Sequence, residues 1–245
     1  MGLALFSMGI NAQIYELRTY TTNDGKLENL HARFRDHTQA IFDKHGMKSL
    51  GYWVPKDEHK SKNTLIYILE HENRESAKVS WKNFIADPNW LKVAKESQIN
   101  GRILAKAPES IFMTSTDYSP LLNKRSHDSN ELNSNSVFEL RIYKTNKDKL
   151  ENLDARFRDN TIGIFDRFNM ESIGYWHSAD TPDSSDTLIY ILRHDSMEAA
   201  KSAWRSFGGD KEWQRVAVES QLDGQILRER PESVFMRATD YSLLR

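Results

Sequence analysis

Three polar side chains at alternating positions of one short segment carry most of the chemistry that the sequence offers. They are Glu16, Arg18 and Tyr20, and the same types return later in the chain as Glu139, Arg141 and Tyr143. Apolar or small residues fill the positions between them, so a strand would put the carboxylate, the guanidinium and the phenol on one face. A guanidinium binds carboxylates and phosphates, while a phenol donates a hydrogen bond or acts as a weak acid. These six residues are therefore candidate ligand-binding groups.

A structural role competes with this functional one. Arg18 can pair with Glu16 on the same face, because a buried charge needs a partner. Tyr20 can pack its ring in the core and find a local acceptor for its hydroxyl. The residue types favour these structural roles over a substrate clamp.

Histidine and tryptophan supply four further candidates. His71 and His194 end equivalent strands, where a histidine can act as a general base or haem ligand, or hydrogen-bond the strand end. Because no second histidine or carboxylate stands at a recognised ligand spacing, no metal site is expected. Trp53 and Trp176 each follow a glycine by two positions on a strand, and this small neighbour leaves room for the indole beside a cavity.

Charged residues also run along the first expected helix of each copy. In the first copy they include Arg33, Arg35 and Asp36. On an amphipathic helix such a string usually forms a solvated outer face with weak local ion pairs. These residues are accordingly expected on the surface.

The elements that must position these side chains occur twice. Residues 14–120 match residues 137–243 at a constant offset, without insertion or deletion. A period of this length is the size of a domain, so the chain is a tandem duplication. We divide it into a segment 1–13, a first domain 14–119, a Ser- and Asn-rich linker 120–136 and a second domain 137–243.

Each copy has the pattern β-α-β-β-α-β, which is typical of the ferredoxin-like arrangement. In the first copy, strands are predicted over 15–20, 47–54, 64–71 and 110–116. Helices are predicted over 26–45 and from residue 73, with a break at Asp87, which caps the helix that follows. Gly46 is expected to end the first helix in the left-handed conformation, and Gly51 to mark a bulge or a close backbone approach.

A sheet of this kind carries helices on one face only, and the second copy is the expected cover for the other face. The fold class is therefore α+β, with two tandem ferredoxin-like domains packed as an intramolecular pseudo-dimeric α/β barrel. In this arrangement the apolar face of the first strand is expected to meet the helices. The face with Glu16, Arg18 and Tyr20 is expected to border the space enclosed by the two copies.

Several strings in the same order resemble the NIPSNAP domain family. They are YELRTY at 15–20, GYW at 51–53, WKNFIADPNW at 81–90 and ESIFM at 109–113. The resemblance covers both copies and implies the dimeric α/β-barrel superfamily, which includes haem-degrading and antibiotic-biosynthesis monooxygenases and muconolactone isomerases. The resemblance implies no particular reaction, because the family has no agreed chemistry. Its eukaryotic members are linked to mitochondria, vesicle traffic and mitophagy signalling.

Composition excludes several classes of function. The chain has 245 residues, a net charge of −1 and no cysteine. Without a basic stripe, nucleic acid is not an expected partner, and without cysteine there are no disulfides, Fe–S clusters or zinc ribbons. No run is long enough to span a membrane. Residues 1–13 resemble the end of a signal peptide, which would mean export, or else form a frayed N-terminus or an extra edge strand of a cytoplasmic protein.

The function favoured by these observations is binding of an unidentified small molecule in the barrel interior. No cofactor is expected, and the residues leave open whether the ligand is also transformed by cofactor-independent chemistry. The alternative is a non-catalytic interaction or scaffold protein, which predicts a filled interior. A weaker alternative is haem handling through His71 or His194. We also consider a further homodimer, in which two chains associate through helical faces or sheet edges.

Overall fold

The computed structural model describes residues 13–120 and 135–245. Both repeats have the predicted order of elements. In the first they are β1 Ile14–Thr21, α1 Leu27–Arg33, the π-helical turn η1 Phe34–Thr38, α2 Gln39–Lys44, β2 Lys48–Pro55, the 3-10 turn η2 Lys60–Lys62, β3 Thr64–His71, α3 Arg74–Ala86, α4 Pro88–Glu96 and β4 Glu109–Ser115. In the second they are β5 Val137–Lys144, α5 Leu150–Arg156, η3 Phe157–Thr161, α6 Ile162–Arg167, β6 Glu171–Ser178, η4 Asp183–Ser185, β7 Thr187–His194, α7 Met197–Gly209, α8 Lys211–Glu219 and β8 Glu232–Ala238.

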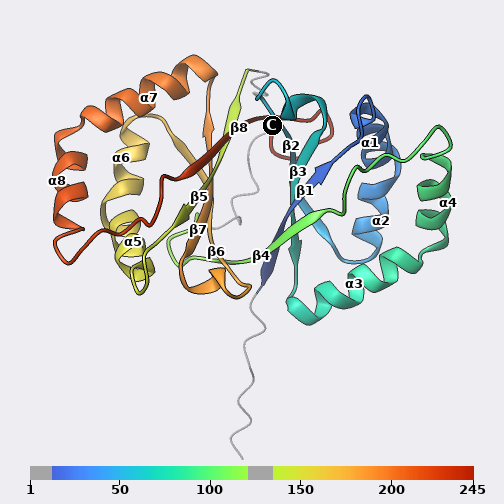
Figure 1. Cartoon of the computed structure of the whole chain (residues 1–245), viewed down its shortest axis with the longest axis horizontal. Coiled ribbons are helices and arrows are strands. Elements are labelled where there is room, and N and C mark those ends of the chain that lie inside the picture. The colour runs from blue at the N-terminus through green and yellow to red at the C-terminus, as the bar shows by residue number, and fades with distance from the viewer. Residues whose placement is uncertain (1–12, 121–134) are drawn as a thin grey trace, which may run out of the picture.

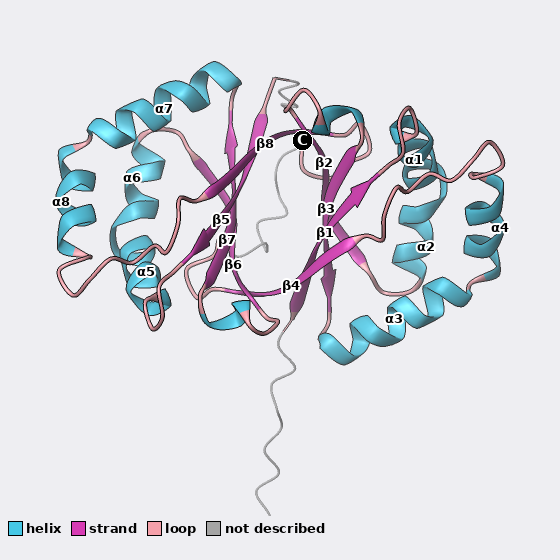
Figure 2. Ribbon diagram, viewed as in Figure 1, coloured by secondary structure: helices cyan, strands magenta, loops and turns pink. Residues whose placement is uncertain are grey.

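The eight strands form one closed barrel in the order β1-β3-β2-β8-β5-β7-β6-β4, with every neighbouring pair antiparallel. Pairing of β2 with β8 and of β4 with β6 joins the two repeats. The helices lie outside, α1 to α4 on one side of the barrel and α5 to α8 on the other (Figures 1 and 2). The predicted pseudo-dimeric α/β barrel is confirmed. Closure leaves no open edge among the described strands for a second chain to extend.

The two faces of β1 point opposite to the prediction. Tyr15 and Leu17 belong to a cluster inside the barrel, while Tyr20 packs with the helices around Phe34. The alternation itself is as expected. The direction was wrong because both faces of this strand are buried, and in that case alternation does not show which face is the interior. The polar face of β1 therefore lies in the layer between sheet and helices.

The residues that end or cap the helices adopt the conformations predicted for them. Gly46 has φ +74°, and Asn169 at the equivalent position has φ 54°, so both end their helices in the left-handed conformation. The Asp87 carboxylate accepts a hydrogen bond from the amide of Asn89 at 2.8 Å and caps α4. These caps fix where the helices begin and end over the sheet.

Gly51 marks both a bulge and a close approach, as predicted. The register of β2 against β3 shifts between Ser49 and Gly51. A Cβ atom at position 51 would lie 2.4 Å from Cζ2 of Trp53, whose ring is fully buried in the barrel against Phe138. The indole therefore occupies the space that a side chain at position 51 would need.

The substitution Gly51→Ala is expected to lower the free energy of unfolding by about 1–3 kcal/mol, because Trp53 cannot move without disturbing the packed interior. Gly163→Ala is the matched control. Gly163 is an exposed residue of α6 with open space around its Cβ position, so this change should stabilise the helix by about 0.5–1 kcal/mol. Urea unfolding curves give both values. Equal stability of Gly51→Ala and the native protein would contradict the close approach.

Two sequence predictions lie outside the described residues. They are the signal-peptide remnant, apart from Gln13 at its end, and the central part of the linker, residues 121–134. Within the described ranges, none of the helices has the length and apolar character needed to cross a membrane.

Candidate functional site

The carboxylate of Glu16 lies at the centre of a buried polar network between β1 and α3. Its side chain is 1% exposed and accepts hydrogen bonds from four side chains. They are Arg18 Nη1 at 2.5 Å, Ser110 Oγ at 2.6 Å, Trp81 Nε1 at 2.7 Å and His71 Nε2 at 3.1 Å. An ionised carboxylate only accepts, so Nε2 of His71 carries the proton. The carboxylate is thus fully satisfied by the protein itself.

The second repeat contains the same network. Its carboxylate, Glu139, accepts from Trp204 Nε1 at 2.6 Å, Arg141 Nη1 and Ser233 Oγ at 2.7 Å, and His194 Nε2 at 3.1 Å. Both repeats therefore contain the arginine–glutamate pair, which is the structural role considered for these residues.

Electrostatics in the network favour the ionised carboxylate. Burial alone would raise the pKa of Glu16. The hydrogen bond from His71, the charge of Arg18 and the hydrogen bonds from Ser110 and Trp81 outweigh burial and lower this pKa to about 2. Glu16 and Arg18 therefore remain an ion pair at neutral pH.

The candidate histidines and tryptophans lie away from open space. His71 and His194 are each 1% exposed, and their Nε2 atoms are engaged by the two glutamates. In this geometry neither of these two imidazoles is accessible as an axial haem ligand. Trp53 and Trp176 are fully buried inside the barrel, where Trp53 packs on Phe138 and Trp176 on Tyr15. They fill the middle of the barrel, and neither lines a cavity described below.

The structure brings Arg18 and Tyr20 together at a cavity of about 490 Å³ outside the barrel, between β1 and the helices of the first repeat. We call it the sheet–helix cavity. Its apolar wall comes from η1, α2, α3, α4 and the segment that follows α4, and consists mainly of Phe34, Phe42, Trp81, Phe84, Trp90 and Leu104. Its size is within the range of pockets that hold small organic molecules.

Arg33, at the end of α1, is the most unusual residue of this cavity. Its side chain is only 5% exposed, yet it forms no ion pair or hydrogen bond with the described part of the chain. Its buried Nε has no hydrogen-bond partner among the residues that the structure describes, and the guanidinium lies 5.3 Å from the centre of the Trp90 ring. Burial lowers the pKa of Arg33, but an arginine stays charged in a protein. No acidic side chain within residues 13–120 and 135–245 therefore compensates the charge of Arg33.

The expected surface position of Arg33 was wrong. Arg35 and Asp36 are exposed as predicted, whereas Arg33 faces the cavity. A signal was present in the sequence: Arg33 follows Leu30 by three positions and so falls on the apolar side of the helix.

A π-helical turn directly after Arg33 interrupts the single helix that was predicted over residues 26–45. The hydroxyl of Thr38 donates to the carbonyl oxygen of Arg33 at 3.0 Å across this turn, and both side chains line the cavity. In the second repeat, Thr161 and Arg156 form the same contact at 3.0 Å. Turns of this kind occur often at functional sites, because they redirect side chains that a regular helix would place elsewhere.

The sheet–helix cavity is positively charged. Its charged lining residues are Arg18, Arg33 and Arg102, and no acidic or histidine side chain appears among the lining residues in the described chain. Glu16 neutralises Arg18, which leaves Arg33 and, at the mouth, Arg102. The cavity therefore suits a bound anion and lacks a side chain that could act as a general base.

The equivalent region of the second repeat is less basic. Arg156 is 6% exposed and lies 5.5 Å from the Trp213 ring, like Arg33 beside Trp90. Gln225 stands at the position of Arg102. The two repeats thus share the buried arginine but differ at the mouth.

The interior of the barrel is packed at its middle by aromatic and aliphatic side chains of both repeats. A cavity of about 380 Å³ remains at one end. No group of three or more acidic or histidine side chains within residues 13–120 and 135–245 is arranged to hold a metal ion.

Comparison with known proteins gives a family and a fold. The family model described as NIPSNAP matches residues 15–120 and 138–243. Among proteins of curated function, none matches the chain. A crystal structure from Lactobacillus acidophilus NCFM named "putative monooxygenase" is 11% identical, with a TM-score of 0.58 over 93% of this chain and 94% of its own.

Two further solved structures are similar. An anthrone oxidase-like protein is 9% identical, with a TM-score of 0.55 over 95% of this chain and 94% of its own. A NIPSNAP family protein from Agrobacterium tumefaciens C58 is 24% identical, with a TM-score of 0.39 over 45% of this chain and 91% of its own. At these identities, the similarity of the two full-length neighbours concerns the fold alone.

Proposed function

The chain belongs to the NIPSNAP family, and from that premise we propose that it binds a small organic anion in the sheet–helix cavity of its first repeat. The observation that carries this proposal is the buried guanidinium of Arg33, which has no acidic partner among the described residues and lines a cavity of about 490 Å³. A buried charge without a partner is costly, so its counter-ion is expected from outside the chain.

The walls of the cavity define the rest of the ligand. Aromatic and aliphatic side chains line the same cavity as Arg33 and Arg102, so the anionic group should be attached to an aromatic or aliphatic body. Carboxylates and phosphates match the forked geometry of arginine. Since the cavity has no acid or histidine to move a proton, binding is better supported than acid–base catalysis.

The scaffold function, the main alternative from the sequence, is favoured by one observation. The middle of the barrel is filled, as that alternative predicts. It leaves the uncompensated charge of Arg33 without a role, and for this reason the ligand-binding proposal is preferred.

Native mass spectrometry of the purified protein, compared with its denatured mass, tests the proposal. We expect a bound organic acid that is lost on denaturation and is missing from Arg33→Met prepared in the same way. The proposal fails if Arg33→Met retains the bound species equally. It also fails, in favour of the scaffold, if the native protein carries nothing even after incubation with a panel of aromatic and aliphatic carboxylates.

A further inference from the structure

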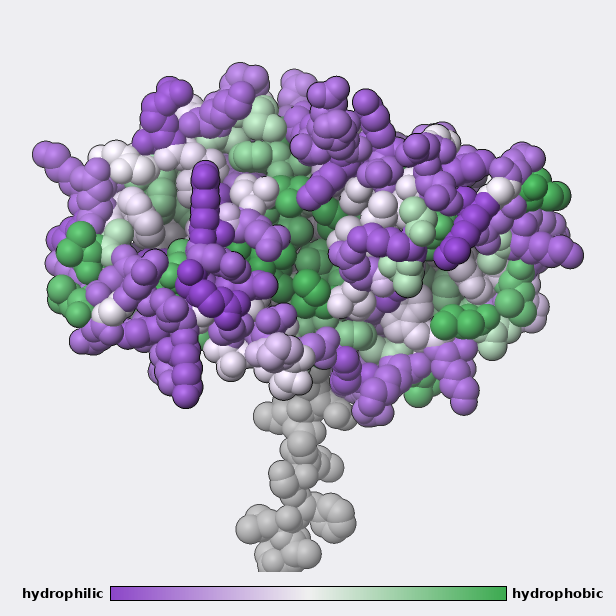
Figure 3. Space-filling view, viewed as in Figure 1, coloured by the Kyte–Doolittle hydropathy of each residue, from purple (hydrophilic) through white to green (hydrophobic). Residues whose placement is uncertain are grey.

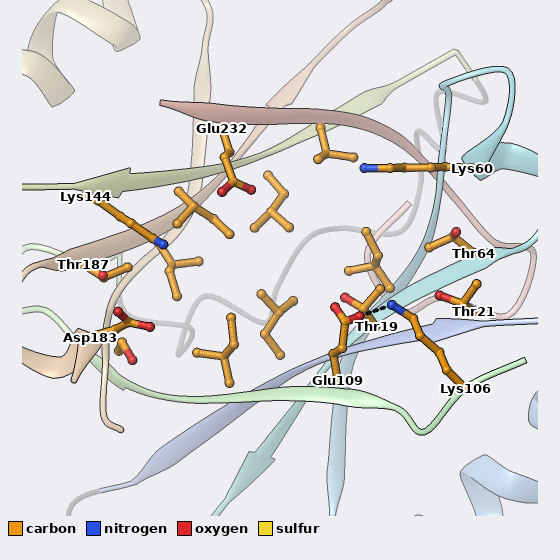
Figure 4. A pocket seen from close by; sticks show the side chains of 18 residues that line it. Thr19, Thr21, Lys60, Thr64, Lys106, Glu109, Lys144, Asp183, Thr187 and Glu232 are labelled. Atoms are coloured by element: carbon orange, nitrogen blue, oxygen red, sulfur yellow. Dashed lines mark hydrogen bonds and ion pairs between the residues drawn. The ribbon is translucent and has the colours of Figure 1, made fainter. Parts of the chain in front are cut away.

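A second cavity lies at one end of the barrel, where the two repeats meet (Figure 4). We call it the barrel-end cavity. It has a volume of about 380 Å³ and shares no lining residue with the sheet–helix cavity. Equivalent residues of the two repeats line it in pairs, such as Leu17 with Leu140 and Ile66 with Ile189. The cavity is therefore centred on the axis that relates the repeats.

The floor of this cavity is apolar and its rim is charged. Figure 3 shows apolar surface between the two halves of the molecule, bordered by hydrophilic side chains. Three lysines and three acidic residues line the rim. Lys106 pairs with Glu109, and Lys144 lies 3.9 Å from Glu229. Three rim charges, Lys60, Asp183 and Glu232, form no ion pair with the part of the chain that the structure describes.

These three charges are separated by sign between the repeats. Lys60 belongs to η2 of the first repeat, and its equivalent in η4 of the second repeat is Asp183. The two side chains lie on opposite sides of the cavity (Figure 4). Two identical subunits would place the same charge on both sides of a twofold axis. The duplicated chain instead has the free ammonium of Lys60 on one wall and the free carboxylate of Asp183 on the opposite wall, while Glu232 lies on β8 between them (Figure 4).

From this arrangement we infer that the barrel-end cavity is a second binding site, for a linear zwitterion with an aliphatic middle, such as an ω-amino acid. The carboxylate of the ligand faces Lys60, its ammonium faces Asp183, and its methylene groups cover the apolar floor. A ligand with one charge satisfies only one wall. A small molecule was expected inside the barrel from the sequence, and this second site would hold one at the end of the barrel.

Titration calorimetry with ω-amino acids from γ-aminobutyrate to ω-aminooctanoate tests this inference. Each zwitterion is compared with the fatty acid and the alkylamine of the same chain length. We expect at least one zwitterion to bind about tenfold more tightly than both of its singly charged analogues, since about 1.4 kcal/mol corresponds to tenfold in affinity. No preference for zwitterions at any length would overturn the inference.

A charge exchange across the cavity supplies the matched control. Lys60→Asp alone and Asp183→Lys alone should each weaken binding about tenfold, because each leaves the same sign of charge at the opposed positions 60 and 183. The double variant Lys60→Asp/Asp183→Lys should restore it, since the ligand can bind in the reverse direction. A double variant as weak as the single ones would contradict the site. Arg33→Met should leave this binding unchanged, which separates the test from that of the sheet–helix cavity.

Discussion

Replacing Glu16 with glutamine is expected to lower the free energy of unfolding by about 3–5 kcal/mol, since removal of one partner leaves a buried charge uncompensated. In the native protein the carboxylate accepts from Arg18, Ser110, Trp81 and His71. An amide removes the negative charge and turns one oxygen into a donor that faces other donors. Chemical denaturation of the two proteins at neutral pH measures the difference.

Glu75→Gln is the matched control for this prediction. Glu75 is 79% exposed and pairs with Lys78 on the surface of α3, so its replacement should cost less than about 1 kcal/mol. If Glu16→Gln were no more destabilising than this control, the network would have no structural role.

The dependence of the free energy of unfolding on acidic pH tests the same substitution a second time. The folded-state pKa of Glu16, about 2, lies below the ordinary value of 4.5. The stabilisation is therefore present above about pH 4.5 and is lost as the pH falls toward 2, and it amounts to roughly 3.5 kcal/mol at about 1.4 kcal/mol per pH unit. Glu16→Gln should lose less stability than the native protein over this interval. Parallel curves would contradict the cause given for the low pKa.

Replacing Arg33 with methionine is expected to weaken binding of an organic anion by more than about thirtyfold, because truncation of a buried charged contact costs at least about 2 kcal/mol. The stability of the free protein should stay within about 1 kcal/mol of the native value or rise. The variant loses a contact with Trp90, but it also removes an uncompensated buried charge. Thermal unfolding without ligand and titration with ligand measure the two effects separately.

Arg35→Met supplies the control for Arg33→Met. Arg35 lies two positions away, is exposed and pairs with Asp240 at 2.7 Å, so its loss should leave ligand binding unchanged. Equal losses of binding in the two variants would mean that general positive charge, and not the buried group, attracts the anion. A strongly destabilised Arg33→Met would mean that Arg33 has a structural role.

The order of the elements could be predicted because each signal was local. Alternation along β1, the cap at Asp87 and the glycine at position 46 all act within a few residues. The internal repeat then indicated that one sheet covers the other. The face of β1 that points into the barrel could not be predicted, because aromatic side chains from distant helices bury the polar face as completely as the barrel buries the apolar one.

The candidate site was predicted in part. Arg18 and Tyr20, which were expected at the space enclosed by the two copies, line the sheet–helix cavity outside the barrel instead, and Glu16 and His71 are buried in a hydrogen-bonded network. Arg33 was missed because periodicity predicts a regular helix and does not reveal a π-helical turn. Polar residues on the apolar side of that helix, Arg33 and Thr38, were the available sign.

The most direct test of the central claim is a titration of the protein with acid and amide pairs of the same shape, such as naphthalene-2-carboxylate and naphthalene-2-carboxamide. Tryptophan fluorescence follows binding, since Trp81 and Trp90 line the sheet–helix cavity. The account predicts that acids in a panel of such pairs bind the native protein, that their amides bind much more weakly, and that Arg33→Met abolishes the difference. A panel in which no acid binds better than its amide would contradict it.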